Sequence, residues 1–163
     1  MSRTLFQRRC DAAWQGNWEY AYQLSRAVQA DAEALERGSR TNLYIVRDAD
    51  SDAVKLGVGV NPAQRVSHLQ IGNPRLLELV DWAPGTEALE RFFHGTLKEY
   101  RIRGEWFAPH EHVLIACELL MSAGDMRRTM DDNGGVPATA EDTVAVLLGT
   151  AEWADEQIEK AVA

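Results

Sequence analysis

The sequence predicts an α+β protein in which a small, mostly antiparallel sheet is flanked by helices at both ends of the chain. Two observations predict this class. Two short β-forming runs, LYIV and AVKLGVGV, surround the acidic turn DADSD, as in a hairpin. The segments that follow alternate between helical and extended patterns. The expected order of elements in the central part of the chain is therefore β-β-α-β-α.

The N-terminal part of the chain is expected to be helical. Apolar residues recur at helical spacing from Thr4 to Arg37, with an interruption expected near Gly16. Gly38 is a typical helix end. This segment is expected to pack against the central sheet.

A helix, a third strand and a second helix are expected after the hairpin. Asn61 is suited to cap a helix that starts at Pro62 and continues through AQRVSHLQ to Gly72. The run LLELVDWA predicts the third strand. The segment TEALERFFHGTLKEYRI is the clearest amphipathic helix of the chain. Its apolar stripe consists of Leu89, Phe93, Leu97 and Tyr100.

The C-terminal part is expected to contain two more helices. HEHVLIACELLMSAG predicts the first, and the polar run DMRRTMDDNGGVP predicts a break after it. Thr139 and Asp142 have capping-box spacing and predict the start of the last helix. We expect a helical extension over residues 1–39, a central domain with a trailing helix over 40–123, and an acidic helical extension over 124–163. The two extensions are expected to pack on the sheet or on each other, or to form a homodimer contact.

The composition narrows the classes of protein. With 163 residues the chain is long enough for one domain with its own core. Cys10 and Cys117 lack the paired spacings of a disulfide framework or a zinc cluster. No signal-peptide pattern occurs, and no apolar run of about 18 residues is present. These features predict a cytoplasmic protein without a membrane partner.

Charge is distributed unevenly along the chain. The net charge of −8 argues at first sight against a phosphate-binding surface. However, residues 40–110 contain nine basic and nine acidic side chains, whereas residues 111–163 contain three basic and eleven acidic ones. The central part can therefore gather a basic face locally. The acidic end can repel DNA, cover that face, or recruit a basic partner.

Several polar side chains are expected to converge on one concave surface. The hairpin can place Tyr44 and Lys55 on one sheet face, and the following helix brings Arg65 towards them. A phenol, an amine, guanidiniums, an imidazole and a carboxylate are what a metal-assisted phosphodiesterase needs. The amphipathic helix is expected to add a polar stripe of Glu90, His94 and Arg101.

These residues resemble the GIY-YIG endonuclease superfamily. In that family a tyrosine stands on the first strand, a tyrosine and a glycine on the second, an arginine on the first helix, a metal-binding glutamate on a later helix, and an asparagine near the end. Here LYI with Tyr44 corresponds to the first motif and KLG with Lys55 to the second. Arg65 falls at the arginine position and Glu90 at the metal-binding glutamate. Glu105 in GEWF lies near the asparagine position.

The phrases VKLG, NPAQRVSHLQIGNP, LERFFH and RGEWF resemble in particular a phage and bacterial branch of the superfamily, in which Lys-Ile-Gly replaces the second motif. The resemblance covers about residues 42–109 and implies an endonuclease that nicks DNA in a bacterial or phage-infected cell. Three positions depart from the family pattern. Leu43 replaces a glycine, Lys55 replaces the second tyrosine, and Glu105 replaces the asparagine.

The resemblance also implies a mechanism. One Mg²⁺ or Mn²⁺ would be held by Glu90 and waters, with Glu105 as a second candidate ligand. Arg65 would neutralise charge on the phosphoryl oxygens. Tyr44, with Lys55 or His94, would orient and deprotonate the attacking water. A lysine serves as a base only if its ammonium loses its proton, and it otherwise binds phosphate as a point charge.

Nucleic acid is the expected partner, with DNA favoured over RNA, although no sequence-reading module is recognisable. Plain structural interpretations stand beside the functional ones: Lys55 as a solvated edge charge, Glu105 as an ion-pair partner of Arg101 or Arg103, and Trp106-Phe107 as core rather than a base-stacking platform. The main alternative function is a nucleic-acid-binding or protein-binding regulatory module that keeps the fold without the chemistry. A third is an oligomeric scaffold built by the flanking helices. The expected nucleic-acid contacts are Arg65, His68, Arg101 and Arg103.

Overall fold

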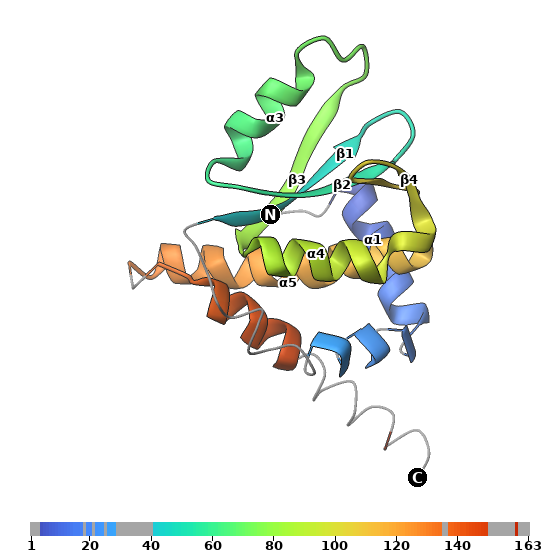
Figure 1. Ribbon diagram of the computed structural model, residues 1–163. Coiled ribbons are helices and arrows are strands. Elements are labelled where there is room, and N and C mark those ends of the chain that lie inside the picture. The colour runs from blue at the N-terminus through green and yellow to red at the C-terminus, as the bar shows by residue number, and fades with distance from the viewer. Residues whose placement is uncertain are drawn as a thin grey trace.

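A five-stranded antiparallel sheet with strand order β3-β1-β2-β5-β4 forms the centre of the protein, with helices at both ends of the chain (Figure 1). The computed structural model describes residues 4–17, 19–20, 22–24, 26–28, 41–134, 137–149 and 159. The strands are β1 (Asn42–Asp48), β2 (Val54–Gly59), β3 (Leu77–Pro84), β4 (Arg101–Arg103) and β5 (Trp106–Phe107). The helices are α1 (Leu5–Gly16), α3 (Pro62–Gln70), α4 (Glu87–Thr96), the 3-10 turn η1 (Lys98–Tyr100) and α5 (Glu111–Asp132). Residues 140–149 are also helical.

The sequence predicted the α+β class, the hairpin and the order β-β-α-β-α, and the structure confirms them. The acidic turn closes because Asp48 accepts hydrogen bonds from the backbone N–H groups of Asp50 and Ser51, at 2.9 and 3.4 Å. Asp52 adopts a φ of 60°, and Arg47 pairs with it across the turn at 2.6 Å. The Asp48 side chain thus closes the turn through the turn's backbone, and Asp52 pairs with a neighbouring arginine.

Side-chain caps fix where the helices begin. Thr4 and Gln7 form a capping box at the start of α1. Asn61 accepts a hydrogen bond from the Gln64 N–H at 3.1 Å, with proline in the first turn of α3, as the sequence predicts. Thr86 caps α4 in the same way. α1 ends at Gly16, where the sequence predicts an interruption.

The two faces of the sheet bury different groups of side chains. Directly opposed residues of antiparallel strands point to the same face, so Tyr44 and Val46 of β1 share one face with Gly57 and Lys55 of β2. α3 covers this face, whereas α4 and α5 lie on the other, as Figure 1 shows. The larger core lies on the α4 side and includes Leu43, Ile45, Leu56, Leu89, Phe93 and Ile115.

Both ends of the chain contribute to this larger core. Buried residues reach it from α1, from α5 and from the helical segment 140–149. Cys10 and Cys117 meet there as buried free thiols between α1 and α5. The other contributions from the two ends are Phe6, Trp14, Leu24, Val28, Val144 and Leu147. The sheet is therefore stabilised by burial of helices from both flanking segments.

α4 is shorter than the sequence predicts, and the sheet has two more strands. The predicted helix runs through Ile102, but α4 ends at Thr96 and is followed by η1 and β4. Gly95 and the β-branched Thr96 weaken the last helical turn. Arg101 then pairs with Phe107 in a β4–β5 hairpin. The prediction of an unbroken helix from Thr86 to Ile102 is therefore wrong.

α5 is longer than predicted. The sequence predicts a break that begins at Asp125, but α5 continues to Asp132. Arg128 holds both carboxylate oxygens of the buried Asp81 in β3, at 2.7 and 2.8 Å, and also pairs with Asp125 one turn earlier. This anchor to the sheet keeps a polar segment helical, against its weak local preference.

Some predictions fall on residues that the structure does not describe. The helical pattern between residues 29 and 40, and the last helix beyond residue 149, lie outside the described residues, apart from position 159. Within the described ranges, none of the helices has the combination of length and apolar character that crossing a bilayer requires. The division into three segments and the homodimer contact stay predictions.

Candidate active site

Tyr44 and Gly57 form the floor of the candidate site. Tyr44 lies in the middle of β1, directly opposite Gly57 in β2, and is 1% exposed. A Cβ atom on Gly57 would lie 2.5 Å from the Tyr44 hydroxyl and 2.6 Å from its Cζ. The phenol ring therefore crosses β2 at Gly57, where only a glycine leaves room for it. The glycine of the KLG motif thus has a steric role: the Tyr44 ring can occupy its position only if residue 57 has no side chain.

Arg65 contacts this phenol from α3. It lies in the second turn of the helix, exposed to solvent, and its guanidinium donates a hydrogen bond to the Tyr44 hydroxyl. Burial raises the pKa of Tyr44 above 10.0, although Arg65 acts in the opposite direction. The phenol therefore keeps its proton at neutral pH. Arg65 retains nitrogen atoms that face solvent and can bind an oxyanion.

Lys55 and Glu105 form an ion pair next to the phenol. The Lys55 ammonium donates to the Glu105 carboxylate, and the two side chains are 8% and 42% exposed. Gly104, with a φ of 56°, makes the tight turn that presents Glu105. Burial alone would raise the pKa of Glu105, but the hydrogen bond and charge of Lys55 lower it below 4.5. Glu105 is therefore a carboxylate at neutral pH.

This ion pair overturns two of the plain interpretations. Lys55 is not a solvated edge charge, because β2 lies between β1 and β5 and the residue is 6% exposed. The partner of Glu105 is Lys55 rather than Arg101 or Arg103. The pair could not be predicted from the sequence, because the two residues are fifty positions apart and meet only when β5 pairs with β2.

α4 contributes Glu90 and His94 to the same place. Burial and the charge of Glu105 raise the pKa of Glu90 above 4.5, while His94 and Lys55 act in the opposite direction. The Glu90 carboxylate makes no hydrogen bond to any residue that the structure describes. His94 Nε2 donates to the Leu56 carbonyl at 2.8 Å, so Nδ1 is the nitrogen left to accept a proton.

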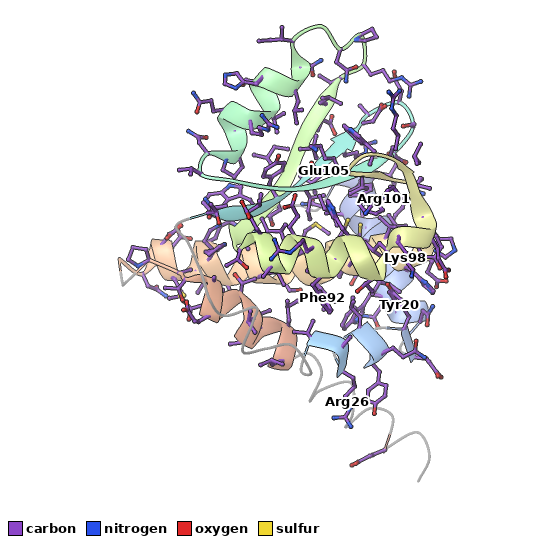
Figure 2. All side chains as sticks on the ribbon, in the orientation of Figure 1. Tyr20, Arg26, Phe92, Lys98, Arg101 and Glu105 are labelled. Atoms are coloured by element: carbon purple, nitrogen blue, oxygen red, sulfur yellow. The ribbon has the colours of Figure 1, made fainter. Side chains whose placement is uncertain are left out.

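Four elements and a turn thus bring six side chains together at one edge of the sheet. β5 pairs only with Val54 and Lys55 of β2, so residues 57–59 have a hydrogen-bonded neighbour on the β1 side alone in the described sheet. Groups from α3 and from α4, on opposite faces, can meet around this open edge. Figure 2 shows Glu105 where β2 and the β4–β5 turn come together. The cluster consists of Tyr44, Lys55, Arg65, Glu90, His94 and Glu105, and is called the edge cluster below.

Three sequence candidates lie outside the edge cluster. Arg101 is not on a helical stripe with Glu90 and His94. It lies in β4, its guanidinium 5.6 Å from the centre of the Phe107 ring and 3.4 Å from the His94 carbonyl, beyond the end of α4 (Figure 2). Arg103 lies opposite Trp106 on the face that α3 covers. His68 is exposed on α3, one turn after Arg65, and its ring makes no hydrogen bond to the described residues.

The composition of the edge cluster limits how a metal ion could be held. Among the residues that the structure describes, no group of three or more His, Cys, Asp or Glu side chains has the arrangement of a metal site. Glu90 offers a half-buried carboxylate without a hydrogen-bond partner in the described chain, whereas Glu105 is engaged by Lys55. A hard cation that keeps most of its waters and takes one or two carboxylates fits this donor set.

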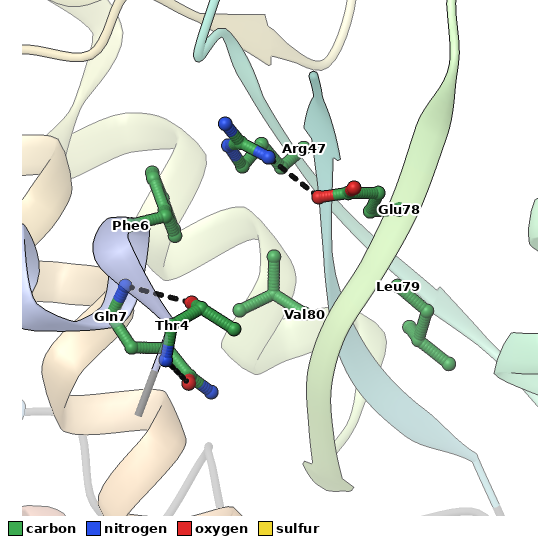
Figure 3. Close-up of a pocket in the computed structure, with 7 residues that line it drawn as sticks. All are labelled: Thr4, Phe6, Gln7, Arg47, Glu78, Leu79 and Val80. Atoms are coloured by element: carbon green, nitrogen blue, oxygen red, sulfur yellow. Dashed lines mark hydrogen bonds and ion pairs between the residues drawn. The ribbon is translucent and has the colours of Figure 1, made fainter. Parts of the chain in front are cut away.

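Two hollows lie outside the edge cluster. One, of about 340 Å³, lies between the start of α1 and the β3 edge of the sheet. Figure 3 shows its two charged groups, Arg47 and Glu78, facing each other as an ion pair of 2.5 Å, so neither is available to a ligand. The other, of about 650 Å³, is lined in part by Trp106 and Arg103.

Trp106 is a residue whose position the sequence interpretation missed. The plain sequence interpretation places both Trp106 and Phe107 in the core, and Phe107 is fully buried there. Trp106 points to the other face, where it is half-buried beside Tyr44, Val46 and Leu77. The alternation of side chains along a strand could have separated the two residues, but only if β5 had been recognised.

One protein-family model matches the part of the chain that carries the edge cluster. The T5orf172 domain matches residues 41–122, half of the chain, from the residue before β1 to the middle of α5. The chain belongs to the T5orf172 domain family. This family is associated with nuclease modules of the GIY-YIG-like and HNH types. The T5orf172 domain includes every residue of the edge cluster. No curated protein and no solved structure showed significant similarity to the chain.

Proposed function

We propose that this T5orf172 protein is a metal-dependent endonuclease that nicks DNA with a GIY-YIG-like site. One observation is the main support: a buried phenol, an ammonium, a guanidinium, an imidazole and two carboxylates meet at a solvent-accessible sheet edge, although they come from four elements and a turn. Such groups suit phosphodiester hydrolysis, in which a water is deprotonated and charge on phosphate is neutralised. The association of the family with nuclease modules points in the same direction.

In this proposal Arg65 and Tyr44 bind the phosphate to be cleaved. Arg65 places its guanidinium against the non-bridging oxygens and neutralises the charge that grows on them. Tyr44, which keeps its proton, donates a hydrogen bond to the phosphate or the attacking water. The contact between the two side chains holds both in position before substrate arrives.

His94 is the proposed base. Its Nε2 is committed to the Leu56 carbonyl at 2.8 Å, which fixes the ring and leaves Nδ1 to take a proton from water. Lys55 is a poorer candidate, because its ammonium is held by Glu105. We assign to Lys55 and Glu105 a positioning role, in which the pair shapes the charge around Glu90.

Glu90 is the proposed ligand for Mg²⁺ or Mn²⁺, with Glu105 as a second ligand only if it leaves Lys55. The bound ion would polarise the scissile phosphate and stabilise the leaving oxygen. Glu90 must be ionised for this role, and its raised pKa places that ionisation at a higher pH than for an exposed glutamate.

The proposal is tested by nicking of supercoiled plasmid at low salt with Mg²⁺ or Mn²⁺. Wild type is compared with Arg65→Ala, Glu90→Gln and the control Arg8→Ala, which removes an exposed arginine from α1. We expect metal-dependent nicking that Arg8→Ala retains. We expect Arg65→Ala to lower the rate by about 10²–10³-fold, as for removal of one transition-state donor.

One observation favours a second function. In this chain an ion pair occupies the positions where the resembling enzymes have a tyrosine and an asparagine, and it neutralises both groups. This substitution would suit a DNA-binding regulatory module that keeps the fold. Absence of nicking by folded wild-type protein, with DNA binding that Arg65→Ala weakens, would reject the nuclease proposal in favour of this second function.

A further inference from the structure

The hollow of about 650 Å³ lies next to the edge cluster, on the same face as Tyr44. It is bounded by the β1–β2 turn, the α3–β3 loop and the β4–β5 hairpin, which Figure 1 shows at one end of the sheet. Its volume is within the range of small-molecule sites, about 300–1,000 Å³. The lining residues that matter here are Asp48, Arg75, Leu77, Ile102, Arg103 and Trp106.

A row of paired residues joins this hollow to the edge cluster. Val46 is opposite Lys55, Lys55 is opposite Trp106, and Trp106 is opposite Arg103. All four therefore lie on one face, side by side across four strands. Lys55 precedes Gly57 by two residues, about 7 Å along the strand. A DNA strand whose phosphate is bound at the edge cluster can therefore place its adjoining nucleotide in the hollow.

The apolar part of the hollow is accessible to solvent. Ile102 is 60% exposed in β4, and Trp106 is half-buried beside it. Exposed apolar groups that line a hollow are typical of binding sites rather than of ordinary surface. The indole of Trp106 provides a flat aromatic surface, and such surfaces bind nucleobases by stacking without selecting their sequence.

The charges of the hollow are complementary to phosphate. Arg75 pairs with Asp48 at 3.0 Å. Burial opposes the ionisation of Asp48, but hydrogen bonds from the Asp50 N–H and from Arg75 hold its pKa below 3.8. Its charge is thus balanced by Arg75. Arg103 is exposed and makes no ion pair with any described residue, so it adds a net positive charge at the rim.

We propose that this hollow, the Trp106 pocket, binds an unpaired base of the DNA strand whose phosphate lies at the edge cluster. The base stacks on Trp106 beside Ile102, and Arg103 binds the phosphate on its far side. This inference rests on the proposed function and names its substrate class: DNA with an unpaired nucleotide beside the cleaved bond. A base inside a regular duplex is stacked between its neighbours and would have to leave the helix to enter the pocket.

The test uses binding, without cleavage, to a short DNA duplex that contains one unpaired 2-aminopurine. The full-length protein is titrated in EDTA, and the fluorescence of the 2-aminopurine is compared with that in the fully paired duplex. We expect quenching and tighter binding with the unpaired probe. Trp106→Ala should remove the quenching and weaken binding about 5- to 150-fold, the range for loss of one base stack.

Two milder variants keep the test valid if Trp106→Ala does not fold. Ile102→Ser changes an exposed side chain and should reduce quenching, while Arg103→Ala should lower the salt dependence of binding by the contribution of about one phosphate. Arg8→Ala, on α1, is the matched control and should change neither quantity. Equal affinity for the paired and unpaired probes, or quenching that survives in Trp106→Ala and Ile102→Ser, would overturn the inference.

The results of this binding test can be distinguished from those of the nicking test. If quenching depends on Trp106 but the protein nicks no plasmid, the Trp106 pocket is supported and the catalytic proposal is rejected. If the protein nicks plasmid with metal, shows no preference for unpaired DNA, and Trp106→Ala and Ile102→Ser leave nicking unchanged, the nuclease proposal is supported and the pocket is rejected.

Discussion

At the scale of single residues, Gly57 supports the edge cluster without belonging to it, because it leaves room for the Tyr44 ring. Gly57→Ala would put a methyl group 2.5 Å from the Tyr44 hydroxyl. Because Tyr44 is buried, its ring must leave the position in which it interacts with Arg65. We expect a destabilisation of about 1–3 kcal/mol, as for other overpacked sites, together with loss of most nicking activity. Thermal unfolding and the plasmid assay measure the two effects.

Gly95→Ala is the matched control for this change. Gly95 lies in α4, and an added Cβ would meet no atom within 4 Å. Alanine favours a helix over glycine by up to about 1 kcal/mol, so this variant should be equally or more stable than wild type and should nick normally. If Gly57→Ala behaved like Gly95→Ala, the close contact between Tyr44 and Gly57 would have no functional importance.

The raised pKa of Glu90 predicts opposite effects of Glu90→Gln on stability and activity. A carboxyl group whose pKa is raised by folding favours the folded state while it is protonated, and this advantage is lost as pH rises through the raised pKa. Glu90→Gln should therefore be at least as stable as wild type at pH 7. The difference in melting temperature should shrink as pH falls and Glu90 becomes protonated.

Activity should follow the charged form of Glu90 instead. Wild-type nicking should decline as pH falls through a value above 4.5, and Glu90→Gln should lower it by about 100-fold or more at every pH. Glu87→Gln, an exposed neighbour in the first turn of α4, is the control and should keep wild-type activity. A Glu90→Gln variant that is both less stable and fully active would reject this account.

At the scale of elements, the contact between α5 and β3 includes one buried carboxylate that α5 holds through both of its oxygens. Asp81 has a 3% exposed side chain, and Arg128 binds both of its oxygens. Arg128→Ala leaves the carboxylate with Arg127 at 3.7 Å and little water. We expect the free energy of unfolding to fall by about 1–3 kcal/mol. Arg91→Ala removes an exposed pair with Glu87 and should change it by less than about 0.5 kcal/mol.

Equal effects of Arg128→Ala and Arg91→Ala in chemical denaturation would contradict the assigned anchor. Gly124 provides a second check, because a side chain there would collide with the Asp81 carboxylate. Gly124→Ala should destabilise the protein for this reason, although alanine favours a helix. A stabilised Gly124→Ala variant would show that the carboxylate has room to move.

The elements also show what could be predicted from sequence. Strands with strong β-forming runs and helices with side-chain caps were found, because their signals are local: LYIV for β1, and Asn61 with Pro62 for α3. β4 and β5 have three and two residues, too few for periodicity to be recognised. The extra length of α5 depends on Asp81, a partner far away in the sequence.

The same limit applies to the candidate site. The resemblance to a family pattern selected Tyr44, Arg65 and Glu90, and these meet in the edge cluster. The ion pair of Lys55 with Glu105 and the exposure of Trp106 follow from the β2–β5 pairing. No local signal predicts that pairing, so neither feature could be read from the sequence.

At the scale of the whole molecule, the acidic C-terminal part cannot be studied by simple removal. Val144 and Leu147 are buried in the core that also contains residues of β1, α1 and α5. Deletion of residues 139–163 would therefore expose core surface and confuse loss of charge with loss of fold. Substitutions that remove charge and keep the chain length separate these effects.

We expect the acidic end to weaken DNA binding by electrostatic repulsion. Asp155→Asn with Glu156→Gln removes two charges from the part of the sequence that has eleven acidic and three basic residues. Affinity for DNA at low salt should rise several-fold, and the gain should vanish near 1 M salt, where the screening length is about 3 Å. Fluorescence anisotropy across a salt series measures both.

The control removes two charges elsewhere, with Asp11→Asn and Glu19→Gln at the N-terminal end. If the acidic end acts on DNA bound at the proposed site, its pair of substitutions should raise affinity more than the control pair does. Equal gains would mean that net charge alone weakens binding, because a charge of −8 repels DNA from any direction. No gain in either variant at low salt would remove repulsion as a cause, and the acidic residues would then be better candidates for contact with a basic partner.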